Sequence, residues 1–385
     1  MTNRRTLLTA SLSGLSLAML GGTASFAQAA QAPGKFVFII LRGAMDGLTA
    51  LVPYGDPAYR SLRGAIALDA PGGPTGVLPL VDGFGLHPGL KEMHSLWQKG
   101  QMSFMHAAAS PYRERSHFDA QDLLEAGTAQ LTSARSGWMN RALAMLPTGP
   151  NQEGVAIGRT IPLVLRGPAK ATSWAPPLAP ESDGDTLARL SDLYAGDAML
   201  SNALAMAIET DRIANGASML DGGGGRGRQG AYAPLASAAA RILAAPGGPA
   251  GAVLSFEGWD THANQGGAQG QLANRLQALD VAIKALREGL GPVWANTTVV
   301  IATEFGRTVR VNGTGGTDHG TGGVSFLLGG AVKGGQMLGD WPGLSRLYED
   351  RDLVPANDVR QLFAHGLTNA WGLDRQAVLL RVFTA

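Results

Sequence analysis

Several short segments of the chain are predominantly hydrophobic and are flanked by glycine and polar residues. The first, Phe-Val-Phe-Ile-Ile-Leu, occupies residues 36–41, and comparable runs lie at residues 102–107, 251–256, 297–302 and 324–328. Hydrophobic runs without polar alternation are typical of strands buried on both faces, as in a parallel sheet covered by helices. The pattern therefore predicts a central sheet built from strands that lie far apart in the chain.

A different periodicity separates two of these runs. Leucines and one isoleucine recur in steps of four and three residues between positions 272 and 290, which places them on one face of a helix. A strand, a helix and a further strand form a right-handed crossover onto a parallel sheet. Further helices are expected at residues 89–99, 116–126, 187–214 and 358–370. The fold class predicted is α/β, a three-layer α/β/α sandwich with a mostly parallel central sheet.

The composition suits a soluble enzyme with many turns. Of the 385 residues, 45% are hydrophobic and only 16% are charged, and the chain has 54 glycines and 21 prolines. The net charge of +1 does not favour a nucleic-acid partner or an anionic membrane surface. Cysteine is absent, which excludes disulfides and thiolate nucleophiles. Any metal must therefore be held by histidines and carboxylates.

The N-terminus predicts an export signal. Arg4 and Arg5 precede a weakly apolar run, and Ala27-Gln28-Ala29 has the small-residue pattern of a cleavage site. Residues 1–29 are interpreted as a twin-arginine signal peptide, with an uncleaved membrane anchor as the alternative. The mature chain is then expected in the periplasm or outside the cell, without a stable membrane anchor. Residues 30–385 are expected to form one domain, with loop insertions near 166–185 and 221–228.

Polar residues gather where the predicted strands end. Asp46 follows the first strand, Asp260 and His262 follow the third, Glu304 follows the fourth, and Asp318 and His319 lead into the fifth. Each of these residues has an ordinary structural role available as a helix cap or turn residue. Ligands of open parallel sheets bind beyond the carboxyl ends of the strands. Taken together, the residues therefore predict a metal site on one rim of the sheet.

Imidazole and carboxylate ligands without thiolates suit Zn²⁺ and, to a lesser degree, Mn²⁺ or Fe. Asp260, His262 and His319 form a natural set of three ligands. Such a set leaves a fourth position for water or substrate, as catalytic zinc requires.

Ser116 marks the expected start of a helix and lies near Arg113 and Arg115. Its ordinary role there is that of an N-cap. The same position places its hydroxyl at the positive end of the helix dipole, where an anion is stabilised. Ser116 is therefore either a cap alone or a cap that also serves as a nucleophile towards phosphorus or sulfur.

These motifs resemble those of the twin-arginine-exported bacterial proteins grouped as domain-of-unknown-function family 1501, a branch of the alkaline phosphatase and sulfatase-like superfamily. The resemblance covers almost the whole mature chain and includes residues 42–47, 115–119, 259–262, 303–308 and 318–320. The family has no settled activity to carry over. The superfamily resemblance implies an alkaline-phosphatase-like sandwich with one or two metal ions and a nucleophile at a helix start.

The resemblance also implies roles for individual residues. Asp260, His262 and His319 would bind the first metal, and Asp46 with Glu304 would support a second. Ser116 would be the nucleophile, while Arg113, Arg115 and Arg307 would neutralise substrate charge. The chain departs from the superfamily at Phe305, where a ligand histidine is expected. Either His117 reaches the second site, or Arg307 supplies the positive charge of the missing metal.

Two functions follow from this reading. The first is an exported metal-dependent hydrolase that acts on a small anionic substrate, a phosphate or sulfate ester. The alternative is a non-catalytic periplasmic binding or assembly protein that keeps the fold with a degenerate second metal site. A formylglycine derived from cysteine is excluded in either case because the chain has no cysteine.

Overall fold

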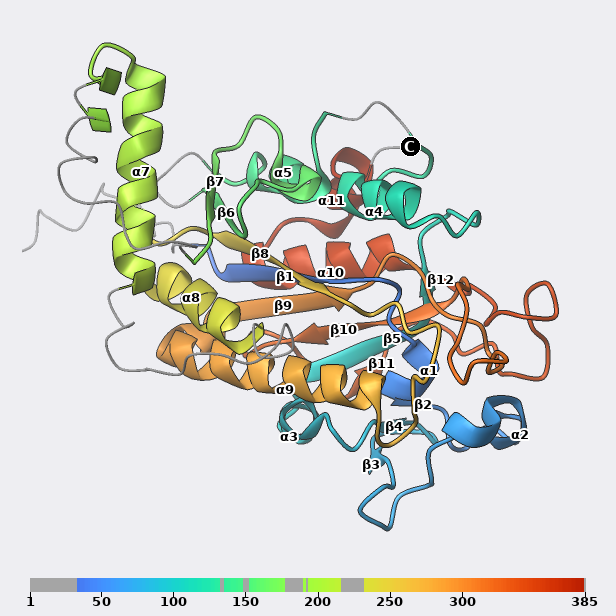
Figure 1. Cartoon of the computed structure of the whole chain (residues 1–385). Coiled ribbons are helices and arrows are strands. Elements are labelled where there is room, and N and C mark those ends of the chain that lie inside the picture. The colour runs from blue at the N-terminus through green and yellow to red at the C-terminus, as the bar shows by residue number, and fades with distance from the viewer. Residues whose placement is uncertain are drawn as a thin grey trace, which may run out of the picture. The chain divides into compact units, whose positions relative to one another are not determined.

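A central mixed sheet organises the protein, seen in a computed structural model (Figure 1). The structure describes residues 33–131, 135–147, 152–176, 190–191, 193–215 and 232–383. Within these residues the sheet has nine strands: β1 (Lys35–Arg42), β5 (Met102–Ala109), β6 (Gly154–Ile157), β7 (Ala171–Trp174), β8 (Gly251–Glu257), β9 (Thr297–Ala302), β10 (Gly323–Leu328), β11 (Gln336–Met337) and β12 (Asn357–Asp358). A separate antiparallel sheet contains β2 (Leu51–Val52), β3 (Leu78–Pro79) and β4 (Gly85–Leu86).

The described α-helices are α1 (Gly47–Ala50), α2 (Tyr59–Arg63), α3 (Lys91–Gln98), α4 (His117–Ala126), α5 (Trp138–Leu143), α7 (Ala198–Asn215), α8 (Tyr232–Ala244), α9 (Gln271–Leu290), α10 (Val359–Trp371) and α11 (Arg375–Arg381). Short 3₁₀ turns occupy η1 (Gly64–Ile66), η2 (Leu163–Leu165) and η5 (Gly291–Asn296). Among these elements, no helix combines the length and hydropathy needed to cross a bilayer.

Strand direction determines which loops meet at one edge of the sheet. The strand order is β11-β5-β10-β9-β1-β8-β6-β7, with β12 beside β5. β1 runs parallel to β8 and β9, whereas β10 runs antiparallel to both β9 and β5. Because β10 is reversed, the loop that precedes it lies at the same edge as the loops that follow β1, β5, β8 and β9. All the candidate site residues come from these loops.

The sheet is covered on both faces (Figure 1). Alternate residues of β1 point to opposite sides, as expected for a strand. Val37 and Ile39 join a core formed with α3, α8 and α9, whereas Phe36 and Phe38 join a core formed with α5, α10 and α11. All four side chains have no exposed surface. Burial on both faces explains why the strand is hydrophobic at every position.

The predicted α/β class, with a mostly parallel sheet between layers of helices, is confirmed. All five predicted strands are present, and four predicted helices correspond to α3, α4, α9 and α10 within a few residues. The helix predicted at residues 187–214 is only partly correct, because α7 begins at Ala198 after a turn at residues 195–197, and residues 187–189 lie outside the described residues. Part of the expected loop at residues 166–185 is instead the edge strand β7, which pairs with β6. Each of these two strands has four residues and gives little periodic signal. The expected signal peptide and the segment 221–228 lie outside the described residues.

His106 lies in the core where β5 reaches the rim. The side chain is 1% exposed and packs against Trp341 and Phe84. Its Nε2 donates to the Leu51 carbonyl at 3.0 Å, and its Nδ1 accepts from the Ala107 amide at 2.9 Å. Both nitrogens are thus used by the backbone, and His106 has a structural role.

Burial lowers the pKa of His106 to about 4. The unfolded chain, with an ordinary histidine pKa of about 6.5, therefore binds the proton first as the pH falls. The stability contributed by neutral His106 is complete above about pH 6.5 and is lost towards pH 4. We expect the free energy of unfolding of the wild type to fall by about 2 kcal/mol between about pH 7.5 and pH 5 because His106 becomes protonated on unfolding. This decrease should be absent in His106→Gln. Urea unfolding at the two pH values measures the difference, with His94→Gln as the control. Equal pH dependence in wild type and His106→Gln would contradict the assignment.

Candidate metal centre

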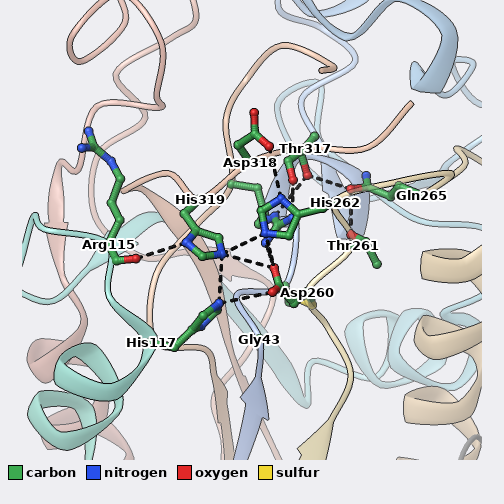
Figure 2. Close-up of polar contacts among 12 residues, drawn as sticks. Gly43, Arg115, His117, Asp260, Thr261, His262, Gln265, Thr317, Asp318 and His319 are labelled. Carbon is green, nitrogen blue, oxygen red and sulfur yellow. Dashed lines mark hydrogen bonds and ion pairs between the residues drawn. The ribbon is translucent and has the colours of Figure 1, made fainter. Parts of the chain in front are cut away.

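Three histidines and one aspartate meet at the rim of the sheet (Figure 2). The Nε2 atom of His319 lies 3.0 Å from Nε2 of His117 and 3.0 Å from Nε2 of His262. Asp260 places its Oδ1 3.0 Å from His262 Nε2 and 3.3 Å from His319 Nε2, and its Oδ2 3.5 Å from His117 Nε2. His117, Asp260 and His319 form a group spaced to hold a metal ion, and His262 borders it.

The other ring nitrogen of each histidine faces an acceptor. His117 Nδ1 lies 2.7 Å from Glu304, and His262 Nδ1 lies 3.1 Å from Asp318. His319 Nδ1 lies 3.1 Å from the carbonyl oxygen of Arg115. Because carboxylates and carbonyls only accept hydrogen bonds, each Nδ1 carries the proton. When the rings carry only this proton, their three Nε2 atoms present lone pairs to one another and to Asp260.

This arrangement fits a divalent metal. Lone pairs about 3 Å apart repel each other unless a cation lies between them. Zinc binds imidazole nitrogen at about 2.0–2.1 Å, so two ligands of a tetrahedral ion lie roughly 3.3 Å apart. The Nε2 and carboxylate separations of 3.0–3.5 Å are close to that value. Histidines that bind metals also donate their second N–H to a carboxylate or carbonyl, as all three do here.

The charges around the cluster support this reading. Burial alone would raise the pKa of Asp260, but the hydrogen bond and charge of Arg307 hold it below its usual value. Arg307 is buried and donates to Asp260 Oδ1. The hydrogen bond to Glu304 raises the pKa of His117, whereas burial lowers that of His319. The side chains are 24–44% exposed, so the cluster is open to solvent on one side.

Glycine permits the close approach of the loops. Gly43 has φ +114°, and a Cβ there would lie 2.6 Å from the Asp260 amide nitrogen. A Cβ on Gly306 would lie 1.9 Å from the carbonyl oxygen of Gly322. Side chains at either position would push the loop that bears Asp260 or the loop that follows His319 away from the rim.

Asp46 and Glu304, expected near a second metal, are not in the cluster. Asp46 is 1% exposed and accepts from the Leu48 amide, Thr49, Arg63 and Gln265. Glu304 accepts from the Gly43 amide, His117, Gln121 and Thr303. Burial would raise the pKa of both carboxyls, but the charge of Arg63 beside Asp46 and the hydrogen bonds donated to each carboxyl lower it instead. Their lone pairs are engaged by the protein.

The set of three ligands predicted from the sequence does not include His117, which the structure places in the cluster. From the sequence, His117 is expected only as a possible ligand of a second metal. In the structure its Nε2 lies 3.0 Å from Nε2 of His319. Phe305, at the position where the sequence resemblance led us to expect a ligand histidine, packs its ring 4.9 Å from that of His117 and 5.2 Å from that of His319. The departure at Phe305 therefore provides an apolar wall for two histidines. The signal that could have found His117 is its position one residue after the helix start that carries Ser116.

Ser116 occupies the N-cap position of α4, with φ −85° and ψ 125°, but its side chain makes no capping hydrogen bond. Its hydroxyl lies against that of Tyr112, which donates to Asp119 at 3.0 Å. Burial and the bond to Asp119 raise the pKa of Tyr112. The expected position of Ser116 is thus observed, while the expected cap bond is absent.

The arginines expected to neutralise a substrate are paired within the protein. Arg115 binds Asp352 and Glu349, and its φ of +59° turns its carbonyl towards His319. Arg307 donates to Asp260 and to the hydroxyl and carbonyl of Thr317. Arg113 donates to the carbonyls of Ser110 and Tyr112. Their interactions thus position parts of the site, and each guanidinium already has acceptors.

The family described as "Protein of unknown function (DUF1501)" matches residues 34–383. The chain belongs to the DUF1501 family. The match covers every loop that contributes to the cluster, in agreement with the resemblance found in the sequence. A comparison of this DUF1501 protein with curated sequences finds no match.

Three solved structures are similar to the DUF1501 chain at low level. The C-terminal periplasmic domain of EcEptC from Escherichia coli, in complex with Zn, has a TM-score of 0.37 at 10% identity, covering 77% of this chain and 73% of that one. A 2-O GAG sulfatase has a TM-score of 0.38 at 10% identity, covering 80% and 66%. The phosphonate monoester hydrolase of Agrobacterium radiobacter has a TM-score of 0.29 at 12% identity, covering 77% and 68%. At these values none of them decides the activity of the DUF1501 protein.

We expect His117→Ala to weaken zinc binding as strongly as His262→Ala, because the Nε2 atoms of both face His319. Glu304→Gln keeps the shape of the side chain that orients His117 and should cost about 10- to 100-fold in affinity. Competition with a fluorescent chelator measures the dissociation constants. His94→Ala, which removes a histidine from α3, is the control. Wild-type zinc affinity in His117→Ala would exclude it as a ligand.

Proposed function

We propose that the protein is a metal-dependent hydrolase of phosphate or sulfate esters that acts outside the cytoplasm after twin-arginine export. One observation carries this proposal: three histidines with protonated Nδ1 atoms direct their Nε2 lone pairs towards Asp260 at a partly open rim. Imidazole and carboxylate are ligand types of zinc, and because four protein ligands complete a tetrahedral shell, substrate would enter from the open side as a fifth ligand. His117, Asp260, His262 and His319 would hold the ion, with Zn²⁺ favoured over Mn²⁺.

The chain's own residues supply the remaining parts. A divalent ion at this site would act as a Lewis acid on an ester oxygen. Ser116 lies one residue before His117, at the start of α4, where the helix dipole stabilises an anion. Its hydroxyl would lose its proton to solvent as the oxygen attacks phosphorus or sulfur, and the bond to the leaving alkoxide would break, the alkoxide leaving as the alcohol after taking up a proton. Water would then cleave the serine ester, which restores the hydroxyl and releases the acid. Tyr112 would hold the Ser116 hydroxyl in place, since it lies against Ser116 and is itself held by Asp119.

One observation favours the alternative, a non-catalytic binding or assembly protein. Arg113, Arg115 and Arg307 all donate to protein acceptors, so none is left without partners to neutralise a doubly charged ester. This pairing favours a singly charged ester if the protein is an enzyme. Comparison of a phosphate monoester with a sulfate ester and a phosphate diester therefore distinguishes these cases.

Ser116→Ala should retain bound zinc while hydrolysis of 4-nitrophenyl sulfate and bis(4-nitrophenyl) phosphate falls by about a thousandfold or more. The loss follows because the attacking oxygen is removed while the cluster stays intact. Release of 4-nitrophenolate by zinc-loaded protein measures the rate, and Ser61→Ala on α2 is the matched control. Undiminished turnover in Ser116→Ala would exclude the serine as nucleophile. A zinc-loaded wild type inactive on all three esters would favour the binding protein.

A further inference from the structure

A buried arginine occupies a pocket made of oxygen atoms. Arg63, the last residue of α2, has no exposed surface. Its Nη1 donates to the carbonyls of Val309 at 2.9 Å and Thr308 at 3.3 Å. Its Nη2 donates to Thr49 Oγ1 at 2.8 Å and to the carboxylate of Asp46. The guanidinium is thus enclosed by one carboxylate, one hydroxyl and two carbonyls.

Such a donor set is the kind that binds a hard cation. Carboxylate, hydroxyl and carbonyl oxygens are the ligands preferred by Ca²⁺ and Mg²⁺. Here the positive charge belongs to a side chain, whose Nε is buried without a hydrogen-bond partner. A buried unpaired donor destabilises the fold, but removing the charge would leave Asp46 ionised and uncompensated, which is costlier. Charge compensation therefore explains why an arginine is held there.

The oxygen pocket is connected to the metal centre by one buried amide. Gln265 has no exposed surface, and its Nε2 donates to Asp46 at 2.6 Å. Its Oε1 accepts from Thr261 at 2.8 Å and from Thr317 at 2.7 Å (Figure 2). Thr261 lies between Asp260 and His262 in the chain.

Thr317 completes the connection on the second loop. Its Oγ1 accepts from Arg307 Nε at 3.2 Å, and Arg307 donates to Asp260. The loop that bears Asp260 and His262 and the loop that bears His319 are thus both linked to the oxygen of Gln265. An ionised Asp46 favours this orientation of the amide, because the flipped amide would turn its own oxygen towards the carboxylate.

We infer that Arg63 acts as a built-in second cation: its guanidinium fills the oxygen pocket around Asp46 and, through Gln265, fixes the loops that bear Asp260, His262 and His319. Arg63 and Gln265 are positioning residues, since neither contacts the histidine cluster. The inference rests on the proposed metal centre for its effect on zinc, but the oxygen pocket can be tested without zinc.

The first test removes the cation and restores it from solution. Arg63→Ala should lower the melting temperature of metal-free protein, and millimolar methylguanidinium or Ca²⁺ should recover a large part of the loss. Arg60→Ala is the matched control because Arg60 lies on the same helix but pairs with Asp69 at the surface. No recovery beyond that of Arg60→Ala would overturn the assignment of a cation pocket.

The second test cuts the connection and keeps the ion pair. Gln265→Met preserves the volume of the side chain and removes its hydrogen bonds, so it does not depend on Arg63→Ala being able to fold. We expect zinc affinity to fall about 10- to 100-fold and the visible absorption of Co²⁺-loaded protein to shift, because the loop bearing Asp260 and His262 is no longer fixed. Unchanged affinity and spectrum in Gln265→Met would overturn the positioning role. A wild type that binds no zinc would refute the metal centre instead, and the recovery experiment would still decide the cation pocket.

Discussion

The site depends on a single electrostatic constraint: three imidazole nitrogens cannot present lone pairs to one another and to a carboxylate without a cation between them. Glu304, Asp318 and the carbonyl of Arg115 enforce this constraint by fixing the proton on each Nδ1. The surrounding structure serves the same arrangement. Arg307 keeps Asp260 ionised, and Phe305 supports two of the rings. The residues that hold the histidines are therefore as informative about the chemistry as the histidines themselves.

The topology of the sheet makes this convergence possible. Asp260 follows the parallel strand β8, whereas His319 precedes β10, which runs in the opposite direction. Reversal of one strand thus brings the start of one loop to the same edge as the end of another. His117 arrives from α4, beyond the end of β5, on the far side of β10. Four ligand candidates from three distant segments meet because strand direction, and not sequence proximity, assigns each loop to an edge.

Much of the fold could be predicted from the sequence because its central strands are buried on both faces and its long helix α9 has a continuous apolar stripe. The short strands β6 and β7 could not, since four residues carry too little periodic signal. The position of the site at the rim of the sheet, and the grouping there of Asp260, His262 and His319, could be predicted because these residues lie at the ends of predicted strands. The ion pair between Asp46 and Arg63 could not be predicted, because it joins α1 to α2 through packing that no local sequence motif encodes. Likewise, Glu304 is a residue type that binds metals, but its carboxylate bonds to Nδ1 of His117, the ring nitrogen that does not face the other histidines.

The central claim is that one divalent ion, and only one, belongs in this protein. Elemental analysis of the protein, purified without chelators and dialysed after exposure to excess zinc, tests it most directly. Our account predicts about one equivalent of zinc per chain, because Asp46 and Glu304 are already engaged and Arg63 supplies the second positive charge. Two equivalents would contradict the built-in cation, and a folded protein that retains no zinc would contradict the metal centre.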